Sequence, residues 1–301
     1  MARSEPDWET YRSFLAVMTE GSLSAAARKL ALTQPTLGRH IDQLEAALEV
    51  PLFSRSQTGL VPTEAAHALL PHAQTMASAA AALVRASSAA EADERGTVRL
   101  TASVMIGGEV LPSLLTEFRE KHPGIAIELV LSDRTQDLLR RDADIAVRMV
   151  RPKQEALVAK KIGRIALGLF AHRRYLARHG VPKSLDDISQ HTVIGFDRET
   201  QALRALRLTG LTLTRDMFAL RCDSDLAQLA ALRAGYGLGV CQLGIAGREI
   251  DLVPVLPGAF RFELDTWLVM HKDLRNTRRM RLLFDHLVES LTAYAATSRF
   301  P

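Results

Sequence analysis

The sequence predicts an α/β protein in which a small, mainly helical domain and one long helix precede a larger domain of two α/β lobes. Three observations lead to this prediction. Two short helical patterns with a turn between them occupy residues 22–45, and an alanine-rich, glycine-free stretch follows at 63–92. Beyond a charged break at 93–96, short apolar strands alternate with helices, which is typical of parallel pairing in a doubly wound α/β fold.

Composition limits the class of protein and its surroundings. Apolar residues make up 47% of the 301, enough for real cores, and the net charge of +4 is compatible with a nucleic-acid partner. No apolar signal-peptide core and no run of 18 apolar residues occurs, so we expect a soluble, cytoplasmic protein without membrane contact. Cys222 and Cys241 have neither metal-ligand nor CxxC spacing, so we expect no metal site, no structural disulfide and a reducing compartment.

Residues 22–45 predict a helix-turn-helix within an N-terminal domain that covers residues 6–63. Ser22 and Thr33 are good N-caps for its two helices. In the second helix, apolar residues recur at helical spacing: Leu37, Ile41 and Leu44. Four polar residues then fall on its outward face or exposed start: Gln34, Thr36, Arg39 and His40. A helix that enters the DNA major groove needs this combination of buried seam and outward donors.

We therefore predict an interface with double-stranded DNA, although the spacing alone leaves open an ordinary helical hairpin. An amphipathic helix over 8–18 would pack beneath the pair, and a β-ribbon over 50–63 would form a wing. The four polar residues would face base edges or nearby phosphates. Ser24, Thr33 and Arg55 would contact the DNA backbone and position the domain on it. The candidate DNA-binding residues are Ser24, Thr33, Gln34, Pro35, Thr36, Arg39, His40 and Arg55.

Residues 64–93 predict a long helix with a continuous seam. Steps of three and four residues relate its members: Ala66, Leu69, Ala73, Met76, Ala80, Leu83, Ser87 and Ala90. Pro71 lies inside this pattern and should bend or loosen the first turns. A stripe of this length exceeds what one small domain can cover, so we expect a homodimer seam and not an exposed spacer. A two-fold dimer would present two recognition helices to a pseudo-palindromic operator.

Residues 97–301 predict the two-lobed domain, a hinged clamshell like that of periplasmic binding proteins. We place the first lobe at about 97–162 and 269–301, and the second at about 163–268. The predicted strands are 97–103, 125–132, 143–150, 165–171, 191–197, 218–223, 236–243 and 266–271. The predicted helices are 110–121, 135–141, 225–235 and 277–292. In such sheets, ligands bind beyond the strand ends.

A small effector is therefore expected between the lobes. The candidate ligands are Ser103, Arg148, Phe196, Asp197, Asp223 and Ser224. Ser103 ends a strand before a helix, where its hydroxyl and free backbone N–H groups suit a carboxylate, so an anionic effector is one expectation. Plain alternatives remain for each: Ser103, Asp223 and Ser224 as N-caps, Phe196 and Asp197 in a surface loop, and Arg148 as a clamp on Asp144.

The order FLAVMTEGSLSAAARKLALTQPTLGRHIDQLEAALEVPLFSR, at 14–55, closely resembles the DNA-binding end of LysR-type transcriptional regulators. Looser matches follow in FREKHPGIAIEL, DADIAVRM, AGYGLGV and HKDLRNTRRMRLLFDHL. Gly38 and His40 stand where such proteins usually carry Ser and Gln, which bears on the DNA sequence preferred. The resemblance implies a DNA-binding regulator that dimerises through the long helix, forms homotetramers and binds its effector at the Ser103 position. RNA polymerase is a further expected partner.

The sequence gives little support for nucleotide binding or for hydrolytic catalysis. GYGLG at 235–239 lies between helix and strand, the reverse of a dinucleotide site, and no P-loop, GxSxG or HExxH pattern occurs. We therefore expect no cofactor and no enzyme activity. Cys222 and Cys241 could form a redox pair, but the apolar setting of Cys241 speaks against it. A cytoplasmic small-molecule-binding protein or an enzyme that uses the same cleft remains the alternative.

Overall fold

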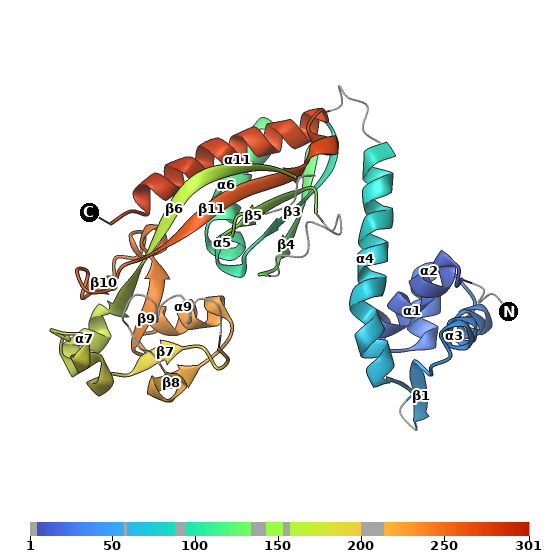
Figure 1. Ribbon diagram of the computed structural model, residues 1–301, viewed down its shortest axis with the longest axis horizontal. Helices are drawn as coiled ribbons and strands as arrows, with labels where there is room; N and C mark the ends of the chain where they lie inside the picture. The colour runs from blue at the N-terminus through green and yellow to red at the C-terminus, as the bar shows by residue number, and fades with distance from the viewer. Residues whose placement is uncertain are drawn as a thin grey trace. The chain divides into compact units, whose positions relative to one another are not determined.

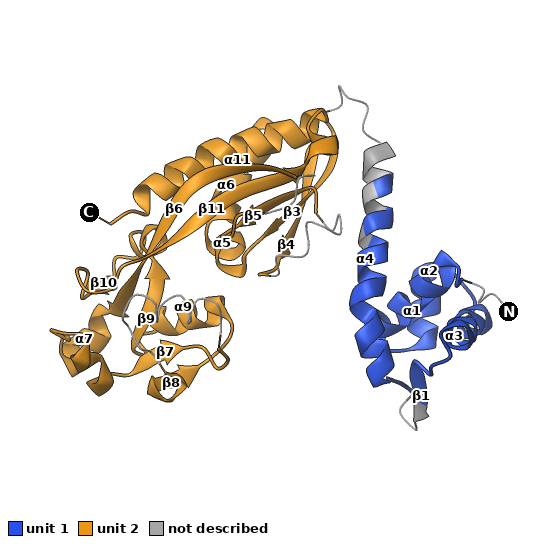
Figure 2. Cartoon of the chain, in the orientation of Figure 1, with its two compact units in different colours: residues 1–87, 140–142 blue, residues 88–139, 143–301 orange. Residues whose placement is uncertain are grey.

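The computed structural model describes residues 5–56, 59–87, 94–133, 143–152, 157–199 and 214–300. The chain divides into two compact units (Figure 2). The described residues up to Ser87 belong to unit 1, and those from Glu94 onward belong to unit 2. Within the described ranges, no helix combines the length and apolarity that a membrane span requires.

Unit 1 contains the predicted winged helix-turn-helix. Its elements are α1 (Trp8–Glu20), α2 (Leu23–Leu30), α3 (Gln34–Leu48), β1 (Phe53–Ser56), β2 (Gly59–Pro62) and α4 (Glu64–Ser87). The strands β1 and β2 pair antiparallel to form the wing. Both predicted N-caps are confirmed, because Ser22 Oγ accepts the Ala25 N–H at 3.2 Å and Thr33 Oγ1 accepts the Thr36 N–H at 3.3 Å.

The core of unit 1 lies where the three short helices meet. Phe14, Leu37 and Leu44 are fully buried, so the predicted apolar face of α3 does pack inward. The start of α4 joins the same core through Ala66 and Ala73.

The burial of Ala66 and Ala73 corrects the prediction that the whole apolar stripe of the long helix is left for a partner. The first half of the stripe is covered by its own unit, because alanines allow α4 to approach the short helices closely. Farther along, Met76 is 40% exposed and Leu83 is 66% exposed. The helix continues through Pro71. The Ser87 side chain and Ala90 lie outside the described residues.

Unit 2 is built on one mixed sheet, with strand order β4-β3-β5-β11-β6-β9-β7-β8 and with β10 beside β6 (Figure 1). The strands are β3 (Gly96–Ala102), β4 (Ile125–Leu131), β5 (Ile145–Arg148), β6 (Leu157–His172), β7 (Val193–Gly195), β8 (Phe218–Arg221), β9 (Leu238–Gln242), β10 (Leu252–Val255) and β11 (Phe262–His271). The α-helices are α5 (Val104–Glu109), α6 (Leu111–Lys121), α7 (Arg173–His179), α9 (Asp225–Arg233), α10 (Leu243–Ala246) and α11 (Arg278–Thr297). The 3-10 helices are η2 (Asp186–Gln190), η3 (Arg215–Met217) and η4 (Lys272–Leu274).

The two lobes share a pair of long antiparallel strands. In lobe 1, β3 pairs parallel with β4 and β5, and α6 and α11 cover one face of the sheet (Figure 1). In lobe 2, β7 pairs parallel with β8 and β9. The strand β11 pairs along its whole length with residues 157–167 of β6, and these two long strands connect the lobes (Figure 1).

The two-lobed α/β fold class is confirmed, but the strand β6, which runs between the lobes, differs from the prediction. The sequence predicted a strand only from Ile165, whereas β6 begins at Leu157. The predicted helix at 135–141 lies outside the described residues.

We expect Leu44→Ala to lower the free energy of unfolding of unit 1 by about 2–4 kcal/mol, because a fully buried leucine leaves a cavity when truncated. Denaturant titration of the full chain in a Trp267→Phe background, where Trp8 is the remaining tryptophan, measures the change by fluorescence. Gln43→Ala alters an exposed neighbour on the same helix and serves as the control. An equal effect of both variants would contradict the packing of α3.

Candidate functional site

The start of α3 is the first candidate site. Thr33, Gln34, Pro35 and Arg39 are exposed, and Thr36 is half-buried. Behind them, the apolar face of α3 is buried against α1 and α2. This arrangement leaves hydrogen-bonding side chains and the helix N-terminus open to solvent on one side of a rigid support. A major-groove contact requires such an arrangement.

Hydrogen bonds order the side chains at this helix start. Ser24 Oγ, on α2, donates to Gln34 Oε1 at 3.0 Å. The hydroxyl oxygens of Thr33 and Thr36 lie 2.8 Å apart, in addition to the capping bond between these residues. Four of the candidate residues are thus paired with one another before any ligand arrives.

His40 differs from the expectation of an outward side chain. It is half-buried, and its Nδ1 lies 2.8 Å from Ser13 Oγ. Ser13 is fully buried on α1. Sequence reasoning missed Ser13, although it stands among the inward residues of α1 as a polar exception. The pair ties the middle of α3 to α1, because a buried hydroxyl needs a hydrogen-bond partner.

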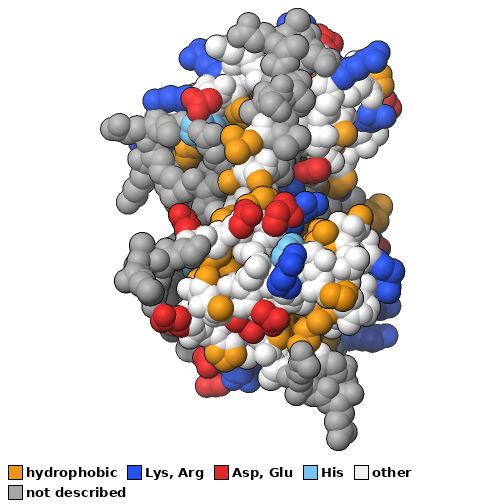
Figure 3. Space-filling model, turned by 90° about the vertical axis from the view of Figure 1, so that its right-hand side faces the viewer, with side chains coloured by type: hydrophobic (Ala, Val, Ile, Leu, Met, Phe, Trp, Pro, Cys, Tyr) orange, Lys and Arg blue, Asp and Glu red, His pale blue; other side chains and the backbone are white. Residues whose placement is uncertain are grey.

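The wing carries Arg55 in β1, opposite Leu60 of β2. The Arg55 side chain lies outside the described part of the structure. On the face drawn in Figure 3, basic and acidic side chains are interspersed over the described surface. This mixture fits the modest net charge of +4.

The strand ends of unit 2 are the second candidate site. Ser103 precedes α5, and its side chain forms no capping hydrogen bond. Instead, Asp133 Oδ1 accepts the Val104 N–H at 3.2 Å. This helix start, where the sequence suggested an anionic ligand, therefore already receives a carboxylate from the chain itself. Sequence reasoning missed Asp133.

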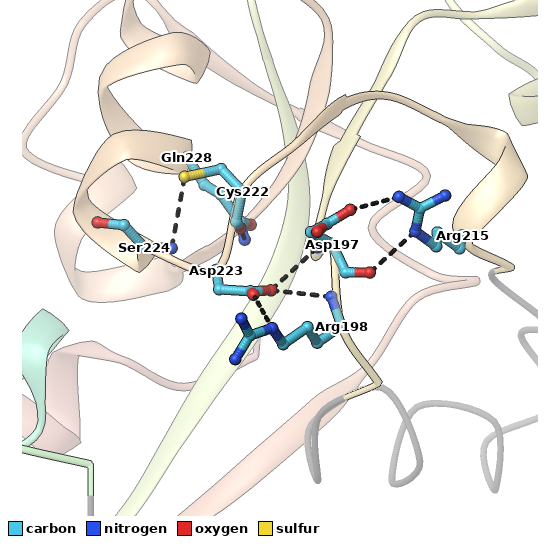
Figure 4. A network of polar contacts seen from close by, with 7 residues as sticks. All are labelled: Asp197, Arg198, Arg215, Cys222, Asp223, Ser224 and Gln228. Atoms are coloured by element: carbon cyan, nitrogen blue, oxygen red, sulfur yellow. Dashed lines mark hydrogen bonds and ion pairs between the residues drawn. The ribbon is translucent and has the colours of Figure 1, made fainter. Parts of the chain in front are cut away.

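In lobe 2, Asp197 and Asp223 form a network (Figure 4). Asp223 Oδ1 accepts the backbone N–H groups of Asp197 and Arg198, both at 3.0 Å. Arg198 Nε lies 3.6 Å from Asp223 Oδ2, and Arg215 Nη2 lies 2.6 Å from Asp197 Oδ1. The structure thus brings together two predicted residues and adds Arg215, which lies far away in sequence. The Asp223 carboxylate joins the segments that follow β7 and β8, and the Asp197 carboxylate binds Arg215 of η3.

The start of α9 continues this network (Figure 4). Ser224 Oγ accepts the Ala227 N–H at 3.3 Å, as the N-cap alternative expected. Cys222 Sγ accepts the Ser224 N–H at 3.5 Å, and Gln228 Nε2 donates to the Cys222 carbonyl at 2.6 Å. Here Gln228 is a further residue that the sequence did not single out.

The other two predicted ligands lie deeper. Phe196 is half-buried and packs against the core of lobe 2. Arg148 is almost fully buried within the sheet of lobe 1. Its Nη2 donates to Thr101 Oγ1 and its Nη1 to the Val147 carbonyl, both at 3.0 Å.

An ion-pair cluster joins the lobes beside these strand ends. Arg233 of α9 donates to Glu109 of α5 through two nitrogens, at 2.9 and 2.6 Å, and also binds Glu249 at 2.6 Å. The hydrogen bonds from Arg233 lower the pKa of Glu109 below its ordinary value, and those bonds raise the pKa of Arg233. Both partners therefore remain charged, and the link spans 124 positions of sequence.

Asp225, the first residue of α9, is the most perturbed carboxyl group near this junction. Burial, and then the nearby Asp133 carboxylate, raise the pKa of Asp225 to about 6. Asp133 follows β4 in lobe 1, whereas Asp225 belongs to lobe 2. Two carboxyl groups from different lobes thus interact where α5 and α9 meet.

The two cysteines do not form a disulfide with each other. Burial raises the pKa of the Cys241 thiol to about 12, which keeps it protonated. Cys222 is half-buried, and both cysteines are free. In the part of the chain that the structure describes, no group of three potential metal ligands comes together.

The geometry defines a class of protein: a winged helix-turn-helix unit, followed by a long helix and a two-lobed α/β unit. Residues 8–67 match the family model for the bacterial regulatory helix-turn-helix protein, lysR family, and residues 91–292 match the LysR substrate binding domain. The chain therefore belongs to the LysR family. It is a DNA-binding transcriptional regulator with an effector-binding domain and not an enzyme.

Relatives of known name are also HTH-type transcriptional regulators. The chain is 27% identical over 296 residues to the probable HTH-type transcriptional regulator LtrA of Klebsiella pneumoniae, and the match covers 96% of each. It is 30% identical over 183 residues to the HTH-type transcriptional regulator CrgA of Neisseria meningitidis serogroup C, and this match covers 61% of each.

Solved structures share the fold. The structure of CrgA from Neisseria meningitidis matches with a TM-score of 0.60 and 24% identity, over 95% of this chain and 99% of that one. Full-length CbnR, described as complexed with its target DNA, matches with a TM-score of 0.66 and 20% identity, over 95% and 99%.

The raised pKa of Asp225 gives a pH-dependent prediction. The folded protein holds this proton more tightly than the unfolded chain, so ionisation above about pH 6 costs stability and the cost fades as the pH falls toward 4. We expect Asp225→Asn to raise the free energy of unfolding by about 1–2 kcal/mol near pH 8 and to have little effect near pH 4.

Denaturant titrations of both proteins at the two pH values measure this difference. Asp285→Asn, at an exposed site on α11, is the matched control and should shift neither value. A pH-independent gain for Asp225→Asn would refute the assignment.

Proposed function

We propose that the exposed start of α3 reads base edges in the major groove of an operator. The observation that carries this proposal is the exposure of Gln34 and Arg39 in front of a fully buried apolar seam. Gln34, Pro35, Thr36 and Arg39 face the duplex, and Thr33 caps the helix. Arg55 on the wing reaches phosphate. His40 positions α3 through its bond to Ser13.

The protein acts as a homodimer that pairs through the second half of α4. Exposed Met76 and Leu83 support this seam, because large apolar side chains on a helix favour a partner. Two copies of α3 then meet a pseudo-palindromic operator, and pairs of dimers form a homotetramer. CbnR, described as complexed with its target DNA, supports DNA binding as the common task. The site of action is the bacterial cytoplasm, with RNA polymerase as a further partner.

A small effector binds between the lobes near Ser103, Asp197, Asp223 and Ser224. It shifts the equilibrium between lobe arrangements by binding one of them more tightly. Backbone N–H groups at the described helix starts already donate to oxygens of the chain, such as Val104 N–H to Asp133, whereas a carboxylate can accept further hydrogen bonds. We therefore favour an effector that donates hydrogen bonds over the anion that the sequence suggested. Ser103, whose hydroxyl forms no capping bond, is its first contact.

We expect Arg39→Ala to weaken operator binding by about 1–3 kcal/mol, because an arginine that grips a guanine contributes this much discrimination. A mobility-shift titration on an operator selected from random duplexes with the wild-type protein measures the affinity. Arg12→Ala, an exposed arginine on α1 that pairs with Glu9, is the control. Unchanged affinity for Arg39→Ala would remove the central contact of this proposal.

We expect Ser103→Ala to abolish the effector response while operator binding remains. A thermal-shift screen of metabolites against the wild-type protein identifies stabilising compounds, and each is then tested on the variant. Ser113→Ala, on α6 of the same lobe, should keep the shift, because its hydroxyl already donates to the Val110 carbonyl. Equal stabilisation of the wild-type and Ser103→Ala proteins would place the effector elsewhere.

A further inference from the structure

The hydrogen bond between Ser24 and Gln34 links two different helices at the exposed start of α3. Ser24 lies in the first turn of α2, and Gln34 is the first residue of α3. The Ser24 hydroxyl donates to Gln34 Oε1 at 3.0 Å, and both side chains are exposed. An exposed hydrogen bond adds little to folding stability. Its proposed effect is on the orientation of the Gln34 carboxamide.

A glutamine carboxamide has two chemically opposite ends. Its oxygen accepts hydrogen bonds, whereas its nitrogen donates two. With Oε1 held toward α2, Nε2 is left as the end available to a ligand of Gln34. A free glutamine turns either end toward a base and so distinguishes donors from acceptors poorly.

The neighbouring groups leave Ser24 as the partner of Gln34. The hydroxyl oxygens of Thr33 and Thr36 lie 2.8 Å from each other, and Thr33 also accepts the Thr36 N–H. Pro35 has no N–H to donate. On the other side, Ala26 and Ala27 bury α2 against the same core as α3, so the Ser24 backbone is fixed relative to Gln34.

We propose that Ser24 is a positioning residue that presets the Gln34 carboxamide, so that its amino group faces the duplex. This inference rests on the proposed DNA-reading role of α3. It assigns Gln34 to an acceptor at a fixed position on the major-groove edge of one base pair, such as guanine O6 or N7, adenine N7 or thymine O4. It also changes the expected role of Ser24 from a backbone contact to a determinant of sequence preference.

The test compares affinities for one operator and for all its single base-pair substitutions. The operator is first selected from random duplexes with the wild-type protein, and the full chain is used throughout. At one base pair in each half-site, we expect the wild-type preference of roughly tenfold to fall to about threefold or less in Ser24→Ala. Ser24→Thr keeps the hydroxyl and should keep the preference.

Two further variants show that Ser24 acts through Gln34. Gln34→Ala should lose the preference at the same base pair, and the double variant should lose no more. Gln34→Glu keeps an oxygen for Ser24 but presents a carboxylate oxygen outward, so its preference at that position should move toward the amino groups of cytosine or adenine.

Contrary outcomes are distinct. A uniform loss of affinity for every duplex in Ser24→Ala would mean that Ser24 binds phosphate directly, and an unchanged preference would mean that it orients nothing. Either result overturns this inference while the DNA-reading role stands. If the wild-type protein selects no duplex, the proposed function itself fails, and the inference fails with it.

Discussion

The candidate sites of this protein depend on one constraint: a helix start leaves backbone N–H groups that need acceptors. At α3, Thr33 meets this need and leaves the side chains of the first turn outside. At α5 the acceptor is Asp133, which follows the strand β4. At α9 it is Ser224. Because side chains of the protein accept these backbone N–H groups, each helix start is ordered before a ligand binds. Binding specificity then depends on the side chains that are not used in capping.

The two lobes of unit 2 are held together by different means. The strands β6 and β11 run between the lobes and are joined to each other by an antiparallel hydrogen-bond ladder, with one register shift at Thr266 and Trp267. The bond between Glu109 and Arg233 is local and electrostatic, and it is only partly shielded from water. Such a pair contributes modestly to stability, so relative motion of the lobes breaks it at a small cost. An effector can therefore shift the balance between arrangements with a few contacts.

Local features were predictable from the sequence, and distant ones were not. The caps Ser22 and Thr33 and the seam of α3 follow from neighbouring residues and helical spacing. The start of β6 was missed because Lys160 and Lys161 interrupt its apolar pattern, and only pairing with β11 reveals the strand. Arg215 near Asp197 and Arg233 near Glu109 depend on the register of a sheet that no local pattern encodes. The inward turn of His40 likewise depends on a serine on another helix.

In the proposed homodimer, the two halves of α4 would carry a signal to the operator. The first half is part of the core of unit 1, because Ala66 and Ala73 are buried with Leu37 and Leu44 of α3. The second half carries exposed Leu83, which suits a partner helix. A helix that is packed at one end and paired at the other transmits rotation with little loss, since closely packed interiors deform little. A change in how two α4 helices pair would therefore change the separation of two recognition helices, to which an operator with fixed half-site spacing is sensitive.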